Sequence, residues 1–225
     1  MSTVDRQAVG DAVNSVRRRI RELSDDRAVQ LIAVTKGFGL DAVDAVTAAG
    51  CHSIGESYAQ ELREKFANVD DVVMPELHFI GRLQTNKVKS IVGLVDVWHS
   101  VDRLAAAEAI ATRATAAQVF VQVNTTAEVA KGGCDPTDTG PLVARCQALG
   151  LVVLGLMTVG PTSGDSGLTR SAFSLLRRQA DDLGLVACSM GMSHDFEIAV
   201  EQGSTHVRIG SALFGERPLH SPQMR

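Results

Sequence analysis

Aromatic residues are scarce in this sequence, at 4% of 225 residues with a single Trp and a single Tyr. Because 45% of the residues are hydrophobic, the core must be largely aliphatic. Long apolar runs are missing as well, and no segment approaches the roughly 18 apolar residues of a membrane-spanning helix. The first residues are charged and helical in pattern, unlike a signal peptide. We therefore expect a cytoplasmic protein.

Cysteine pairs and an excess of positive charge are also absent. The four cysteines are far apart, with no CxxC pair and no histidine at metal-ligand spacing. They predict apolar core positions in a reducing compartment, with neither a disulfide framework nor a metal site. The formal net charge is −4. Nucleic acid and membrane surfaces are therefore poor candidate partners, and a bound anion would need a local site.

Two hydrophobic rhythms organise the chain. Residues 5–24 have apolar positions at helical spacing and predict an amphipathic helix. Short apolar runs then alternate with helical segments, as in parallel βα structures. The predicted strands cover residues 31–35, 52–55, 77–80, 95–99, 119–123, 152–156, 185–188 and 206–209. The predicted intervening helices cover residues 40–49, 58–66, 86–92, 102–114, 139–149, 168–183 and 193–202.

Eight consecutive βα units predict a single (β/α)8 barrel, a TIM barrel with an extra N-terminal helix, as one domain over residues 1–225. An open doubly wound sheet is the alternative fold, but no GxGxxG motif follows the first strand. The irregular stretches 124–138 and 160–167 both follow strands. They therefore predict loops on one barrel face.

Active sites of such barrels form at the carboxyl ends of the strands, so the residues after each apolar run are the candidates. They are Lys36, Glu56, Ser57, Gly81, Gln84, Ser100, Asn124, Met157, Thr158, Ser189, Gly191, Ser193, Gly210 and Ser211. Lys36 directly follows an apolar strand, where burial would lower the pKa of its amine and favour Schiff-base chemistry. A solvated lysine at the rim is the alternative. The other lysines lie in predicted helices or loops.

An anion site is predicted after the last two strands. Ser189, Gly191 and Ser193 follow the seventh strand, while Gly210 and Ser211 follow the eighth. Loops at these two places form the recurrent phosphate site of barrels, although Gly and Ser are also ordinary loop residues.

Arg208 lies within the last predicted strand and needs a partner if it is buried. A carboxylate such as Glu56 or Glu197 would give a structural ion pair. In the functional alternative, the guanidinium faces a ligand and keeps a pyridine nitrogen unprotonated, which makes the ring a weaker electron sink.

Six motifs resemble those of the YggS/PROSC family of pyridoxal phosphate homeostasis proteins. They are LIAVTK (31–36), GESYAQE (55–61), HFIGRLQTNK (78–87), GLMTV (155–159), SMGMSHDFEIAV (189–200) and GSTHVRIGSALFG (203–215). The resemblance implies a barrel similar to the N-terminal domain of alanine racemase. It also implies pyridoxal 5'-phosphate (PLP) held as an internal aldimine, with no established catalytic turnover.

Carried over by position, the resemblance implies that Lys36 forms the aldimine and that Arg208 faces the pyridine nitrogen. The phosphate would be held by Ser193, Gly210 and Ser211, with help from the turn over residues 189–191. Ser57 and Met157 are further cofactor-binding candidates. Ser57 departs from the family, which commonly has Asn at this position. Because the serine side chain is shorter, the resemblance does not decide whether this residue contacts the cofactor ring.

Three functions follow from these patterns. The first is a monomeric PLP-binding protein, with PLP-dependent apoenzymes as possible recipients. The second is a PLP-dependent amino-acid racemase, but the alanine type takes a second base, a tyrosine, from another domain. Here the single tyrosine is Tyr58, near the second strand. The third is a class I aldolase, whose lysine usually lies on a middle strand.

Overall fold

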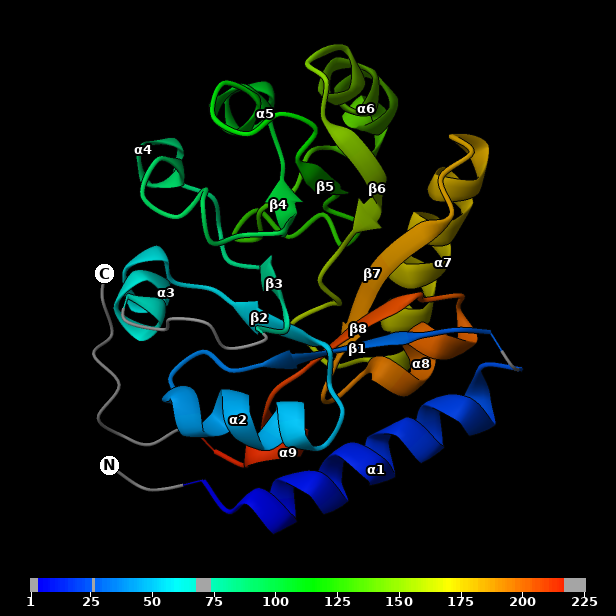
Figure 1. Ribbon diagram of the computed structural model, residues 1–225. Coiled ribbons are helices and arrows are strands. Elements are labelled where there is room, and N and C mark those ends of the chain that lie inside the picture. Colours follow the sequence, from blue (N-terminus) through cyan, green and yellow to red (C-terminus); the bar gives the residue numbers. More distant parts are fainter. Residues whose placement is uncertain (1–3, 26, 68–73, 217–225) are drawn as a thin grey trace.

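The computed structural model describes residues 4–25, 27–67 and 74–216. Its strands form a closed parallel barrel in sequence order, in which β1 also pairs with β8 (Figure 1). They are β1 (Gln30–Val34), β2 (Ser53–Glu56), β3 (Glu76–Phe79), β4 (Val97–Val101), β5 (Gln118–Gln122), β6 (Val152–Met157), β7 (Ala187–Met192) and β8 (His206–Ile209). The predicted (β/α)8 barrel is confirmed, and the alternative prediction of an open doubly wound sheet is wrong.

Helices follow the strands and surround the barrel (Figure 1). They are α2 (Leu40–Ala48), α3 (Ala59–Phe66), α4 (Thr85–Val88), α5 (Leu104–Ala111), α6 (Thr139–Ala148), α7 (Ser166–Asp182), α8 (Phe196–Glu201) and α9 (Ser211–Phe214), with a 3-10 helix, η1 (Pro136–Asp138), before α6. The short helix α9 was not predicted. In the part of the chain that the structure describes, no helix has the length and apolar character needed to cross a membrane.

The N-terminal helix α1 (Arg6–Leu23) lies outside this ring, against α2, α8 and α9 (Figure 1). Its apolar stripe is buried, and Asp5 caps its first turn by accepting hydrogen bonds from two backbone amides. The stripe consists of Val9, Val13, Val16 and Ile20. The predicted amphipathic helix is therefore confirmed within one residue at each end.

Successive side chains of each strand point alternately into the barrel and outward to the helices, which decides which of them reach the interior. Gly55 on β2 faces Ile32 and Val34 on β1, whose Cγ2 atoms would lie 3.1 and 3.5 Å from a Cβ at that position. Leu31 and Ala33, by contrast, belong to the core cluster between strands and helices. Because strand side chains alternate, Lys36 continues the inward-facing series at the carboxyl end of β1.

The barrel interior is partly polar. Its apolar side chains include Ile32 and Val34 on β1 and a small cluster of Val97, Phe120, Met157 and Ala187. Buried polar side chains fill much of the remainder, namely His78, His99, Ser189 and Arg208. Interiors of such barrels are ordinarily filled by branched apolar residues, so this composition marks the interior as more than a packing core.

Candidate functional site

Lys36 follows β1 at the barrel mouth and is partly buried. The wall behind it contains a buried ion pair that the sequence did not predict. Lys65 on α3 donates to Glu56 Oε1 at 2.6 Å and to the Thr35 carbonyl at 2.9 Å. Thr35 Oγ1 donates to the same Glu56 oxygen at 2.7 Å. Thr35, the residue before Lys36, is thereby tied to α3 through its backbone carbonyl.

The Glu56 and Lys65 side chains therefore make contacts that the sequence did not predict. Glu56 follows the predicted second strand, yet its carboxylate faces α3 instead of the mouth, because it occupies an outward position on β2. Lys65 lies on a helix as predicted, but its amine reaches the strand wall and its side chain is 4% exposed. Burial raises the pKa of the Glu56 carboxyl, and the hydrogen bonds from Lys65 and Thr35 oppose that shift.

Arg208 is buried in β8 with three hydrogen bonds to neutral groups. Its Nη1 donates to the Ser189 carbonyl at 2.8 Å and to Ser189 Oγ at 2.6 Å, while its Nη2 donates to the Thr158 carbonyl at 2.8 Å. Burial lowers its pKa to about 10, and the guanidinium stays charged at neutral pH. Remaining donors on Nη2 and Nε can serve an acceptor in the mouth.

The structural ion pair considered for Arg208 is absent among the described residues. Glu56 binds Lys65, and Glu197 on α8 binds Arg19 on α1 at 2.8 Å. A buried charge without a paired carboxylate is costly, so such a residue is a strong functional candidate.

The loops after β7 and β8 meet at Ser193. Its Oγ accepts hydrogen bonds from the backbone amides of Gly210 and Ala212, both at 3.2 Å. Ser211 begins α9 between these two amides and is exposed. Two backbone donors converging on one oxygen are the kind of arrangement that holds an anion.

Four other predicted site residues lie in different surroundings. β7 extends to Met192, so Ser189 and Gly191 are inside the strand and do not follow it. The Ser189 hydroxyl is taken by Arg208 instead of facing the Ser193 loop. Gly191 has φ of +95°, and a Cβ there would lie 2.5 Å from the Ala199 Cβ. Close packing against α8 therefore requires this glycine.

Met157 and Ser57 are the remaining predicted cofactor-binding residues. Met157 is 2% exposed and packs in the small interior cluster with Phe120. Ser57 is partly buried directly after β2. Its carbonyl oxygen would lie 1.9 Å from a Cβ at position 81, so Gly81 lets the loops after β2 and β3 come together.

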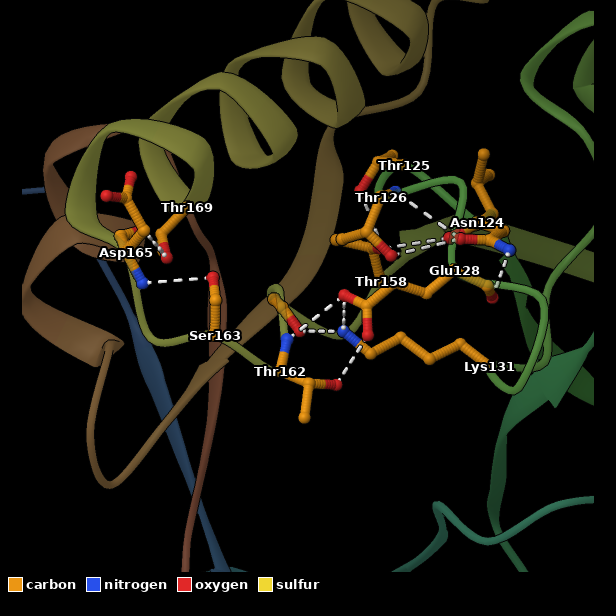
Figure 2. Close-up of polar contacts among 12 residues, drawn as sticks. Asn124, Thr125, Thr126, Glu128, Lys131, Thr158, Thr162, Ser163, Asp165 and Thr169 are labelled. Carbon is orange, nitrogen blue, oxygen red and sulfur yellow. Dashed lines mark hydrogen bonds and ion pairs between the residues drawn. The ribbon is translucent and has the colours of Figure 1, made fainter.

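The loops after β5 and β6 are joined by a polar cluster (Figure 2). Glu128 accepts from Lys131 Nζ at 2.7 Å, from the Thr162 amide at 3.0 Å and from Thr162 Oγ1 at 2.5 Å. Lys131 also donates to the Gly160 carbonyl. The two loops, both predicted to lie on one face, are therefore held to each other by contacts from the Glu128 carboxylate and the Lys131 amine.

The Glu128 carboxylate should keep its hydrogen bonds at pH values well below those at which glutamate side chains usually titrate. The hydrogen bond from Lys131, followed by those from Thr162, lowers the pKa of Glu128 from 4.5 to about 2. A lowered pKa means that the contact persists above pH 4.5 and is lost as the pH falls toward 2. We expect the Thr162 amide resonance to stay unchanged at pH 4.5 in the wild type and to be shifted at all pH values in Glu128→Gln. A pH titration of the Thr162 amide resonance with its midpoint near pH 4.5 would contradict this expectation.

Comparison with known proteins places these features in a family. The family model described as "Alanine racemase, N-terminal domain" matches residues 4–218. The pyridoxal phosphate homeostasis protein of Pseudomonas aeruginosa is 37% identical over 95% of this chain and 98% of its own length. The human protein of the same name is 35% identical over 93% of this chain and 86% of its own.

A solved structure agrees with this relationship. PipY of Synechococcus elongatus, with PLP bound, has a TM-score of 0.80 and 30% identity, covering 92% of this chain and 100% of its own. The chain belongs to the family of pyridoxal phosphate homeostasis proteins, whose barrel is that of the alanine racemase N-terminal domain.

Proposed function

We propose that this protein binds PLP in the barrel mouth and takes part in intracellular PLP homeostasis, with the cofactor bonded covalently to the Lys36 amine. The observation that carries the proposal is Arg208, a buried guanidinium that pairs with no carboxylate among the described residues. It lies on β8, where it pairs with Ile32 on β1, the strand that leads to Lys36. A lysine and an arginine on adjacent strands suit a ligand with an aldehyde and a ring nitrogen.

The remaining residues suit the other end of the same ligand. Ser193, Gly210 and Ser211 would hold the phosphate. Two backbone amides of the loop after β8 already converge on the Ser193 hydroxyl oxygen in the loop after β7. Ser57 and Met157 would adjoin the ring, and Ser189 would hold Arg208 in place. When bound, PLP supplies an electron sink, and an arginine opposite its nitrogen makes that sink weaker. This favours storage of the cofactor over catalysis.

The proposed protein is accordingly a cytoplasmic, monomeric carrier without catalytic turnover, and PLP-dependent apoenzymes are its proposed recipients. The names of its relatives support a homeostatic role. The alternative, an amino-acid racemase, needs a second acid or base beside Lys36. Tyr58 is 45% exposed at the start of α3, so it provides no enclosed group for that purpose.

Borohydride reduction tests the assignment of Lys36. We expect the wild-type protein reconstituted with PLP to absorb in the visible range and, after reduction, to carry the label on the Lys36 peptide. Lys36→Ala should lose that labelled peptide and bind PLP on the order of tenfold or more weakly, equivalent to about 1.4 kcal/mol. Lys89→Ala, which removes an exposed lysine, is the matched control.

Two outcomes would overturn the proposal. A protein that stays colourless with PLP and carries no label after reduction would exclude the cofactor site. Racemisation of an amino acid by the reconstituted protein would replace the carrier with the racemase.

A further inference from the structure

A continuous chain of hydrogen bonds crosses the barrel interior and ends on Arg208. Glu76 Oε2 lies 2.8 Å from His78 Nε2, and His78 Nδ1 lies 2.7 Å from His99 Nε2. His99 Nδ1 lies 3.0 Å from Ser189 Oγ, which accepts from Arg208 Nη1 at 2.6 Å. We call the four residues below Arg208 the lumen chain: Glu76, His78, His99 and Ser189.

The lumen chain runs through the inside of the barrel and not along its wall. His99 is on β4 and Ser189 on β7, and these strands are not neighbours in the sheet, so their bond spans the interior. His78, His99 and Ser189 are at most 1% exposed, whereas the Glu76 side chain is 39% exposed at the opposite end of the barrel from Lys36. The chain therefore joins solvent at the amino end of the strands to the proposed ligand site.

Burying two imidazoles where apolar side chains would pack costs stability unless every nitrogen is satisfied. All four ring nitrogens of His78 and His99 have partners in the lumen chain. The neighbouring His206 is not part of it, because its Nδ1 pairs with Thr205 Oγ1 at 2.7 Å. The lumen chain is thus unbranched from His78 to Ser189.

The two ends fix the direction of every hydrogen in between. Arginine only donates, so Ser189 Oγ accepts from Arg208 and gives its own hydrogen to His99 Nδ1. His99, neutral because burial lowers its pKa far below the ordinary value, then donates from Nε2 to His78 Nδ1. His78 donates from Nε2 to the Glu76 carboxylate, whose pKa the His78 hydrogen bond lowers to about 2.

The opposite direction leaves a group unsatisfied. If His99 donated from Nδ1, Ser189 Oγ would accept from both His99 and Arg208, and its hydroxyl hydrogen would have no acceptor among its described partners. A single arrangement therefore satisfies the lumen chain, with both histidines protonated at Nε2.

We propose that the lumen chain is a positioning relay, which holds the Arg208 guanidinium in register for the ligand ring nitrogen and is anchored at its far end by Glu76. The ligand side of this inference rests on the proposed function. Glu76 has no part in the mouth itself, so its effect on binding must pass through the chain.

Nitrogen NMR of the protein without cofactor tests the relay independently of PLP. With 15N-histidine, we expect His78 and His99 each to carry a hydrogen on Nε2 and to accept at Nδ1. Glu76→Leu, which removes the terminal acceptor, should abolish the single tautomer at both rings. Glu76→Gln retains an acceptor oxygen and should preserve it. An Nδ1–H tautomer at His99 in the wild type would overturn the assignment.

PLP titration then tests the positioning role. Networks of this kind couple distant sites by amounts that correspond to roughly 2- to 30-fold in affinity, so Glu76→Leu should raise the Kd for PLP within that range. Asp96→Ala is the control at the same end of the barrel, since Asp96 accepts from the Leu77 amide at 2.7 Å outside the lumen chain. It should lower stability and leave both tautomers and the Kd unchanged.

The outcomes separate the relay from the proposed function. Tautomers that change in Glu76→Leu while its Kd stays at the wild-type value would refute positioning. An equal rise in Kd for Asp96→Ala would reduce the effect to general destabilisation and also refute it. A wild-type protein that binds no PLP would refute the proposed function, while the NMR result on the histidines would still stand or fall by itself.

Discussion

Lys65→Met should lower the free energy of unfolding by about 3–5 kcal/mol, the cost of leaving one partner of a buried ion pair uncompensated. The Lys65 and Glu56 side chains are 4% and 0% exposed, and Glu56 Oε2 already lacks a hydrogen-bond partner. Removing the ammonium leaves Glu56 with only the Thr35 hydroxyl from the present contacts. Urea denaturation of the protein without cofactor measures this loss.

Two further variants give the result its meaning. The double variant Glu56→Gln with Lys65→Met removes both charges, so it should recover much of the lost stability. Lys87→Met changes an exposed lysine and should stay within about 0.5 kcal/mol of the wild type. A loss in Lys65→Met no larger than that of Lys87→Met would show that the pair is not formed in solution.

Replacing Arg208 should have the largest effect on binding. Arg208→Gln removes the charge from the proposed ring contact, and hydrogen bonds to charged groups contribute about 1.5–3 kcal/mol. We therefore expect the Kd for PLP to rise roughly 10- to 150-fold, measured by titration of the visible absorption. Arg208→Lys keeps a charge without the planar fork and should give an intermediate Kd.

A spectral readout distinguishes ring contact from loss of packing. Arg208→Glu should allow the ring nitrogen to be protonated and so alter the visible spectrum of bound PLP, whereas Arg208→Lys should not. Far-UV circular dichroism would confirm that each variant retains the barrel. A spectrum of Arg208→Glu identical to that of the wild type would place Arg208 away from the ring.

The sequence predicted the barrel well because short, largely apolar runs alternate with helical segments along the chain. β8 was predicted without error at its bounds, and β1 within one residue at each end. β7 was predicted at 185–188, which starts two residues too early and ends four residues too early, since Ser189 and Gly191 interrupt its apolar pattern. Both face the interior or α8 for specific reasons, which are a contact with Arg208 and close packing against Ala199.

The parts of the site that sequence alone did not reveal depend on closure of the barrel. Lys65 was correctly placed on a helix, but its contact with Glu56 depends on how α3 packs against β2. The bond between His99 and Ser189 joins residues 90 positions apart across the interior. Ser189 was predicted as a site residue and His78 lies in the HFIGRLQTNK motif, but nothing local in the sequence indicates that His99 joins them.

The pairing of β1 with β8 gives the proposed site a consequence for folding. Lys36 follows the first strand and Arg208 lies in the last, so the two halves of the site come together only when the barrel closes. Such long-range contacts form slowly, because the chain between them must be ordered first. A ligand that bridges them would act as a clasp across the seam of the barrel, and it would raise resistance to unfolding by mass action. Cofactor loading would then report that the chain has finished folding.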